Sequence, residues 1–339
     1  MKIATSNNPM IIAEVGVNHN GDLDLGRKLI DVAVECGADI VKFQTFVANR
    51  LATGHAPQAS YQKQNLGVDQ SQIDMLAKLE LTHEMHVALL EHCRSKNIEF
   101  LSTAFDAVSL DYLVDLGIKR IKVPSGELTN FPYLEEVASK GLSVILSTGM
   151  ADLDEVRDGV AILMAGGVAC GDLTILHCTS NYPAQPGELN MLAVRTLYEE
   201  FGCDVGYSDH SSGCEAAMLA VALGARVLEK HITLDRTMSG PDHLASMEPD
   251  EFKIYVRAAR MAILALGDGV KKPSKAEAET ALIVRKSIVA SRPISIGEMF
   301  SAENLTTKRP GAGMSPMRWH DVIGKQATRD FAADEMIEV

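Results

Sequence analysis

Eight short apolar runs alternate with amphipathic helical segments over the first 268 residues, and no other feature restricts the fold of this chain as strongly. Strands separated by helices pair in parallel, and eight such units close into a (β/α)8 barrel. We therefore predict an α/β fold in which residues 1–268 form a TIM barrel. The expected strands are Met10–Val15, Ile40–Phe43, Glu99–Ser102, Arg120–Val123, Ser143–Ser147, Leu173–His177, Asp204–Tyr207 and Val227–Glu229.

A doubly wound open sheet is the alternative architecture. Such a sheet has fewer strands and commonly a glycine-rich phosphate loop after the first one. Here the first strand leads into Val17-Asn18-His19-Asn20-Gly21, which does not have the G-x-G-x-x-G pattern. The barrel is therefore favoured, and the long polar segment 48–80 after its second strand is expected to build or cover a site.

The composition changes beyond the eighth strand unit. Residues 269–283 contain Lys271-Lys272-Pro273-Ser274-Lys275 and are interpreted as a linker. Residues 284–339 have short strand-like runs and a Gly/Pro-rich stretch at 309–314. We expect a small second domain there, which would gain stability by docking on another surface.

The overall charge restricts the class of ligand. The formal net charge is -13, whereas binding to nucleic acid requires a basic surface. A local group of lysines can still bind a small anion. No stretch approaches the ~20 apolar residues of a membrane span, so we expect neither nucleic acid nor membrane as a partner.

The N-terminus and the cysteines indicate a cytoplasmic protein. Residues 10–15 are interpreted as a strand, because they lack the long apolar region of a signal peptide. None of the six cysteines forms a C-x-x-C pair, which argues against a structural zinc site. We expect all six to be reduced thiols.

Polar side chains that suit catalysis follow nearly every expected strand. Barrel active sites form at the carboxyl ends of the strands, so these side chains would share one mouth. A single lysine at such a position is more often a solvated charge, but the joint pattern indicates a pocket for a phosphorylated carboxylate and a metal. The residues are His19, Lys42, Gln44, Thr103, Lys122, Ser125, Glu127, Ser147, Thr148, His177, Thr179, Ser180, Ser208, His210, Lys230 and His231.

Lys42 and Lys122 lie in apolar surroundings, in Val41-Lys42-Phe43 and Ile121-Lys122-Val123. We predict that both ammonium groups point along the barrel axis. Two inward cations would repel each other unless an anion lay between them, which is the physical case for a bound phosphate or carboxylate.

The turn Pro124-Ser125-Gly126-Glu127 follows directly after Lys122. Ser125 and its backbone N–H are expected to help hold the anion. Glu127 is then a candidate general acid/base, and the alternative is a surface carboxylate.

His210 and His231 each follow an expected strand end. Neutral imidazole is the commonest metal-binding side chain, and two imidazoles leave most of a metal's coordination sphere open to substrate. The alternative is that both rings only fill the top of the barrel.

As a set, these motifs resemble the sialic acid (N-acetylneuraminate) synthases, and in particular the bacterial branch that includes legionaminic and pseudaminic acid synthases. The likeness covers nearly the whole chain. Lys308-Arg309-Pro310-Gly311 resembles the antifreeze-like (SAF) domain of that family. The motifs are Asn18-His19-Asn20-Gly21, Val41-Lys42-Phe43-Gln44-Thr45, Lys122-Val123-Pro124-Ser125-Gly126-Glu127, Leu146-Ser147-Thr148-Gly149-Met150, His177-Cys178-Thr179, Gly206-Tyr207-Ser208-Asp209-His210 and Glu229-Lys230-His231.

The resemblance implies a synthase that condenses phosphoenolpyruvate with an N-acetylmannosamine-type sugar, giving an N-acetylneuraminate-type nonulosonic acid and phosphate. It also implies Mn²⁺ or Mg²⁺ at His210 and His231, and Glu127 as acid/base. A domain-swapped homodimer is implied, in which Arg309 reaches the partner's sugar. Residues implied to hold phosphoenolpyruvate are Lys42, Lys122, Ser125, Ser147 and Ser208; those implied to face the sugar are Gln44, Thr103, Tyr182 and Asp242.

Two departures from the family pattern leave alternatives open. Some members have Glu, in contact with the sugar, where this chain has Asn20, which favours a legionaminic acid synthase acting on 2,4-diacetamido-2,4,6-trideoxymannose as the alternative. The family often has Asn after its Cys-Thr pair, where this chain has Ser180 followed by Asn181, and either side chain can hold phosphoenolpyruvate. More distant alternatives are another phosphoenolpyruvate-condensing 3-deoxy sugar acid synthase and a non-enzymatic protein that binds sugar or ice.

Overall fold

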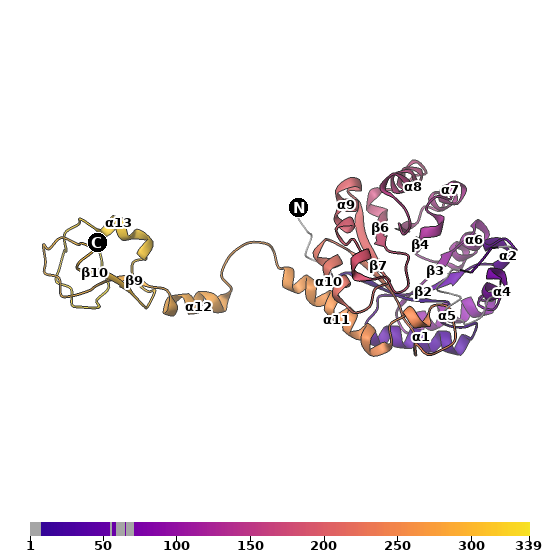
Figure 1. The fold of residues 1–339 in the computed structure, drawn as a ribbon, viewed down its shortest axis with the longest axis horizontal. Coiled ribbons are helices and arrows are strands. Elements are labelled where there is room, and N and C mark those ends of the chain that lie inside the picture. The colour runs from indigo at the N-terminus through magenta and orange to yellow at the C-terminus, as the bar shows by residue number, and fades with distance from the viewer. Residues whose placement is uncertain (1–7, 55, 59–64, 66–70) are drawn as a thin grey trace. The chain divides into compact units, whose positions relative to one another are not determined.

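The computed structural model describes residues 8–54, 56–58, 65 and 71–339. Their contacts divide the chain into two compact units, Met1–Asp268 and Gly269–Val339. Figure 1 shows the strands of the first unit surrounded by helices.

The first unit confirms the predicted barrel. Its eight strands form one closed parallel sheet in chain order, and β8 pairs back with β1. Several strands extend past the carboxyl end expected from the sequence, because the polar residues there still pair with a neighbouring strand. The strands are β1 (Met10–Gly16), β2 (Ile40–Thr45), β3 (Glu99–Ala104), β4 (Arg120–Val123), β5 (Ser143–Ser147), β6 (Leu173–Cys178), β7 (Asp204–Asp209) and β8 (Val227–His231).

Helices cover the outer face of the barrel, and α1 shows how the sequence sets their ends. The Asp22 carboxylate accepts hydrogen bonds from the backbone N–H groups of Asp24 and Leu25 at its start. Gly37, with φ 85°, ends it in the left-handed conformation. The helices are α1 (Leu23–Cys36), α2 (Ala48–Leu51), α4 (Gln72–Ala77), α5 (His83–Ser95), α6 (Ala107–Leu116), α7 (Phe131–Ser139), α8 (Leu153–Ala165), α9 (Leu192–Phe201), α10 (Glu215–Ala222) and α11 (Pro249–Leu266).

None of the helices in the described part of the chain is long and apolar enough to cross a membrane.

The inside of the barrel is layered, because alternate residues of each strand face the axis. One layer is apolar and contains Ile12, Ile40, Leu101, Ile145, Leu176 and Val227. Two residues farther along the same strands come Glu14, Lys42, Thr103, Ser147, Cys178 and Glu229. The strand alternation therefore places a polar layer directly on an apolar base, at the carboxyl end of the barrel.

The segment between β2 and α5 contributes helices α2 and α4 beside this end of the barrel. Ser71 caps α4, and Met75, Leu76 and Leu79 pack in a small apolar cluster with Val17 and Phe46. Part of the segment lies outside the described residues. The described part presents an apolar surface next to the polar layer.

The second unit contains α12 (Lys275–Val284), β9 (Ser287–Ala290), β10 (Leu305–Lys308) and α13 (Trp319–Val322). Strands β9 and β10 pair antiparallel, and Ile288, Phe300 and Phe331 belong to a separate apolar core. Most of α12 lies in the segment that we interpreted as a linker. The Ser274 side chain and Glu277 form a capping box that starts this helix, a signal present in the sequence.

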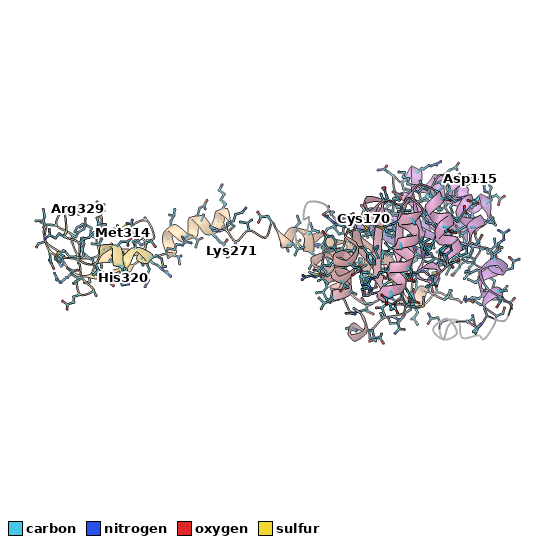
Figure 2. All side chains as sticks on the ribbon, turned by 90° about the horizontal axis from the view of Figure 1, so that it is seen from above. Asp115, Cys170, Lys271, Met314, His320 and Arg329 are labelled. Atoms are coloured by element: carbon cyan, nitrogen blue, oxygen red, sulfur yellow. A yellow bond between two sulfur atoms is a disulfide. The ribbon has the colours of Figure 1, made fainter. Side chains whose placement is uncertain are left out.

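The expectation of six reduced thiols is wrong for two of them. Cys170, labelled in Figure 2, forms a disulfide with Cys203, and their Cα atoms are 5.0 Å apart. Both residues lie just before neighbouring strands, β6 and β7, so the parallel sheet brings them together. Sequence spacing alone did not reveal the pair, because 33 residues separate them.

Candidate active site

A cavity of about 500 Å³ opens at the carboxyl end of the barrel. It brings together most of the residues singled out from the sequence, from the ends of different strands. These are Lys42, Gln44, Thr103, Lys122, Ser125, Ser147, Ser180, Tyr182, Ser208, His210, His231 and Asp242. Arg309 belongs to the second unit.

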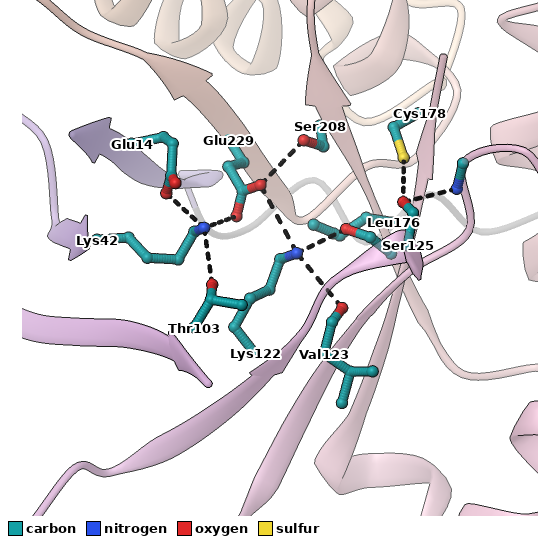
Figure 3. A network of polar contacts seen from close by, with 12 residues as sticks. Glu14, Lys42, Thr103, Lys122, Val123, Ser125, Leu176, Cys178, Ser208 and Glu229 are labelled. Atoms are coloured by element: carbon teal, nitrogen blue, oxygen red, sulfur yellow. Dashed lines mark hydrogen bonds and ion pairs between the residues drawn. The ribbon is translucent and has the colours of Figure 1, made fainter. Parts of the chain in front are cut away.

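A network of four buried charges forms the floor of the cavity (Figure 3). The Lys42 ammonium contacts the Glu14 carboxylate, and its Nζ lies 3.6 Å from Glu229 Oε2. The Lys122 Nζ lies 3.7 Å from Glu229 Oε1. Glu229 therefore lies between the two lysines and interacts with both.

Hydroxyl groups complete the network. Lys42 Nζ donates to Thr103 Oγ1 at 3.1 Å, and Lys122 Nζ donates to Ser147 Oγ at 2.7 Å. Ser208 Oγ donates to Glu229 Oε1 at 2.9 Å. Each hydroxyl comes from a different strand, so the network ties β3, β5 and β7 to the lysines and to Glu229.

The prediction that the lysines point inward holds, but their mutual repulsion does not require a substrate anion. Burial opposes charge on Glu229, and Lys122 and Lys42 together outweigh it and lower its pKa. Burial likewise opposes charge on Lys42, yet Glu14 and Glu229 raise its pKa. The protein's own carboxylates thus compensate Lys42, whereas at Lys122 burial outweighs Glu229 and lowers the pKa of the ammonium group.

Sequence reasoning missed Glu14 and Glu229, which both line the cavity. A signal for them was available. Each lies two residues after an apolar, axis-facing residue, Ile12 in β1 and Val227 in β8, so strand alternation points both carboxylates inward.

A second group of polar atoms gathers beside Lys122. Ser125 Oγ accepts a hydrogen bond from the Gly149 backbone N–H at 2.9 Å and lies 3.3 Å from Cys178 Sγ. A Cβ on Gly149 would lie 2.3 Å from Ser180 Oγ and 2.8 Å from Ser125 Oγ. Glycine at this position therefore allows hydroxyls from the turns after β4 and β6 to converge next to an ammonium group, which suits an anionic ligand.

Several residues of the first unit that were expected at the site do not line the cavity; they are His19, Thr148, His177, Thr179, Lys230, Glu127, Asn181 and Asn20. His19 Nδ1 accepts from the Gly21 backbone N–H at 3.0 Å, His177 Nε2 is hydrogen-bonded to the Leu189 carbonyl oxygen at 2.7 Å, and Lys230 Nζ lies 3.3 Å from Asp209 Oδ1.

The short 3-10 turn η1 (Ser125–Glu127) directs Glu127 toward the start of α7, where Oε2 accepts from Asn130 Nδ2 at 2.5 Å. Asn181 Nδ2 donates to Glu188 Oε2 at 3.0 Å, so Ser180, and not Asn181, faces the cavity. Asn20 donates from Nδ2 to the Ser239 carbonyl oxygen at 2.9 Å.

His210 and His231 lie together at the rim, with ring centroids 5.8 Å apart, and Tyr182 packs on His210 at 4.1 Å. Burial lowers the pKa of His210 to about 4 and that of His231 well below its usual range, so both rings are neutral. His210 Nδ1 is hydrogen-bonded to the Thr179 carbonyl oxygen at 2.7 Å.

These features fit a metal held by two imidazoles. Nδ1 of His231 is buried without a hydrogen-bond partner among the described residues. No group of three or more His, Cys, Asp or Glu side chains suited to a metal occurs in the part of the chain that the structure describes. A metal here would therefore keep coordination positions for water or substrate.

The remaining wall of the cavity combines apolar side chains with one carboxylate. Leu51, Met75, Leu79 and Phe105 line it, together with Asp242. Burial raises the pKa of Asp242 to about 6. The cavity thus has a charged floor and an apolar wall, which suits a ligand with anionic and apolar groups.

The comparisons with known proteins assign the family. The NeuB family model matches residues 29–271, and the SAF domain model matches residues 285–338. The chain belongs to the NeuB family. It is an enzyme of this family, since its relatives are named as synthases.

The similarity extends over whole proteins. An N,N'-diacetyllegionaminic acid synthase of Campylobacter jejuni is 50% identical over 97% of this chain and 98% of its own length. Another from Legionella pneumophila is 47% identical over 95% of this chain and 91% of its own. The crystal structure of a sialic acid synthetase from Leptospira borgpetersenii, in complex with citrate, is 34% identical, with a TM-score of 0.72 over 81% of this chain and 90% of that one.

Proposed function

We propose that this enzyme condenses phosphoenolpyruvate with 2,4-diacetamido-2,4,6-trideoxymannose to form N,N'-diacetyllegionaminic acid and phosphate. From the sequence, N-acetylmannosamine was the first expectation and the legionaminic precursor the alternative. The two legionaminic acid synthases, at 50% and 47% identity, favour the alternative.

The observation that carries this choice is the apolar wall of Leu51, Met75, Leu79 and Phe105. The proposed sugar has a methyl group where N-acetylmannosamine has a 6-hydroxyl, and it carries a second acetamido methyl. Burying a hydroxyl without a partner costs about 1–3 kcal/mol, whereas a buried methyl is favourable. An apolar wall therefore favours the deoxy, diacetamido sugar.

Phosphoenolpyruvate is proposed to bind at the charged floor. Its carboxylate and phosphate would take hydrogen bonds from Lys42, Lys122 and the converging hydroxyls of Ser125 and Ser180. The floor is close to charge balance before the anion enters, so the bound anion would compete with Glu14 and Glu229 for the lysines.

Mn²⁺ or Mg²⁺ is proposed to bind His210 and His231. When bound, such a metal acts as a Lewis acid on the aldehyde oxygen of the open-chain sugar. The ring of Tyr182, packed on His210, would limit access of water from that side.

The proposed reaction forms one C–C bond and breaks one C–O bond. C3 of phosphoenolpyruvate attacks the aldehyde carbon of the sugar, whose oxygen takes up a proton and becomes a hydroxyl. Water adds at C2 and loses its protons, one of which balances that uptake and the other of which leaves with phosphate. The bond between C2 and the phosphate oxygen breaks, so that a ketone remains at C2. Lys42 and Lys122 offset the charge that remains on carboxylate and phosphate. A carboxylate is required to move the proton of the added water, and Glu14 in the cavity and Glu127 beside it are the two candidates.

A homodimer in the cytoplasm is part of the proposal. The second unit of one protomer would cover the barrel of its partner, and Arg309 would reach the partner's sugar. The resemblance to the family's antifreeze-like domain supports this arrangement, as does the match of residues 285–338 to the SAF domain.

A competition assay tests the proposed function. The enzyme receives phosphoenolpyruvate, Mn²⁺ and equal amounts of N-acetylmannosamine and 2,4-diacetamido-2,4,6-trideoxymannose, and the products are identified by mass spectrometry. We expect mainly N,N'-diacetyllegionaminate. Mainly N-acetylneuraminate would contradict the substrate assignment, and turnover only with a phosphorylated aldose would contradict the reaction class.

A further inference from the structure

The segment Ser239–His243, which follows β8, determines where one of the cavity's acidic groups lies. Pro241 and Asp242 of this segment line the cavity. Asp242 is only 9% exposed, and among the described residues no side chain donates to its carboxylate, although its backbone carbonyl oxygen accepts from Ser246 Oγ at 2.7 Å. Its position therefore depends on how the segment is held.

The Asn20 side chain holds this segment on both sides of Asp242. Its Nδ2 donates to the Ser239 carbonyl oxygen at 2.9 Å, and its Oδ1 accepts from His243 Nε2 at 3.2 Å. The backbone of Asn20 is left-handed, with φ 51°, a conformation that asparagine adopts more readily than most residues. One amide from the β1 loop thus clamps the two ends of the turn that carries Asp242.

Close packing supports this clamp. A Cβ on Gly240 would lie 2.9 Å from Asn20 Oδ1 and 2.5 Å from His243 Cδ2, so the turn lies directly against both side chains. His243 is in turn anchored by a 2.7 Å hydrogen bond between Nδ1 and Thr233 Oγ1. Because the Asn20 Oδ1 can only accept, Nε2 of His243 carries the proton in the contact between them.

We propose that Asn20 is a positioning residue for sugar binding, acting through Asp242 from outside the cavity. By holding Ser239 and His243, it sets the depth at which the Asp242 carboxylate meets an N–H or hydroxyl of the sugar. This inference rests on the proposed function for the identity of that sugar. A carboxylate side chain at this position cannot donate to the Ser239 carbonyl and would repel it.

The test is the substitution Asn20→Asp, which keeps the shape and the acceptor but removes the donor. We expect the sugar KM to rise about tenfold, the worth of one hydrogen bond, while the KM for phosphoenolpyruvate stays within about twofold. Asn20→Gly, which tolerates the positive φ and removes both contacts, should raise the sugar KM further. An unchanged sugar KM in both variants would overturn the proposal.

A double-mutant cycle separates positioning from direct contact. If Asn20 acts through Asp242, Asn20→Asp should add less than about twofold to the sugar KM in an Asp242→Asn background. Fully multiplicative effects would overturn the proposal, since they would mean that Asn20 acts on the sugar independently. A parallel rise in both substrates' KM would also overturn it, because that is the result of a general disturbance of the site.

Asn97 provides the matched control. It has φ 56° and is exposed at the opposite end of the barrel, before β3. Asn97→Asp should leave all kinetic constants unchanged. The wild-type product is identified first, and every variant is then assayed with the sugar that the wild type condenses. If that sugar is N-acetylmannosamine, the substrate assignment fails while the test of Asn20 keeps its meaning.

Discussion

Glu229 is the residue on which the charge balance of the cavity floor depends, because it interacts with both Lys42 and Lys122. Removing one partner of a buried ion pair costs about 3–5 kcal/mol, since the remaining charge is uncompensated. We predict that Glu229→Gln lowers Tm by several degrees, and that phosphoenolpyruvate raises Tm more in the variant than in the wild type. Thermal unfolding of the variant and the wild type, with and without phosphoenolpyruvate, measures these Tm values. If phosphoenolpyruvate raised Tm equally in both proteins, the anion would not bind at these lysines.

Glu14 and Glu127 are the two candidates for the proton-transfer group, and they differ in where they lie. Glu14 lines the cavity, whereas the Glu127 carboxylate accepts from Asn130. We predict that Glu14→Gln lowers kcat by about 100-fold or more, the usual contribution of a general acid/base, and that Glu127→Gln lowers it less. Steady-state phosphate release measures this. The reverse order would assign the role to Glu127, which would then have to turn from Asn130 during the reaction.

Asp242 predicts a pH dependence of sugar binding. Burial raises the pKa of Asp242 to about 6, so the carboxylate that is proposed to accept from the sugar becomes protonated as pH falls through 6. The sugar KM should rise below that pH in the wild type but not in Asp242→Asn, measured from pH 5 to 8. The effect on stability has the opposite sign: with a folded pKa above the ordinary 3.8, this group's contribution to stability is fully present at low pH and lost as pH rises through about 6.

At the scale of elements, the turn after β5 depends on Gly149. Because a Cβ there would lie 2.3 Å from Ser180 Oγ, we predict that Gly149→Ala moves the hydroxyl groups apart and raises the KM for phosphoenolpyruvate about tenfold, with a smaller change in the sugar KM. Gly126→Ala is the matched control, since a Cβ there meets nothing within 4 Å although Gly126 also lines the cavity. Equal effects of the two substitutions would contradict this role.

The same elements show how far the sequence predicts the site. Strand alternation places Lys42, Lys122 and Ser147 inside the barrel, because their apolar neighbours in β2, β4 and β5 face the surrounding helices. Prediction from strand alternation fails where the backbone leaves the strand. The η1 turn directs Glu127 away from the cavity, and the alternation of apolar and polar residues does not predict the direction of a side chain in a turn. The sequence also does not reveal the hydrogen bond from Asn20 to the Ser239 carbonyl oxygen, because the two residues lie 219 positions apart in the chain.

At the scale of the whole molecule, the proposed dimer would bring Arg309 of the second unit to the barrel of a partner. If the second unit caps a partner's barrel, Arg309→Ala removes charge-assisted hydrogen bonds and should raise the sugar KM by roughly 10–100-fold, while Tm changes little. Arg318→Ala is the control in the same unit, since Arg318 pairs only with nearby Asp321 at the surface among the described residues. Wild-type kinetics in Arg309→Ala would contradict the capping role.

The apolar base of the barrel, formed by Ile12, Ile40 and their neighbours, has a kinetic consequence. It fills the barrel below Lys42, so ligands reach the cavity floor from the carboxyl end of the strands. Asp242 lies in the loop beyond β8, farther from that base than the lysines. Phosphoenolpyruvate would thus have to bind before the sugar. A sugar that bound first would block the access of phosphoenolpyruvate to the lysines, which would give substrate inhibition at high sugar concentration.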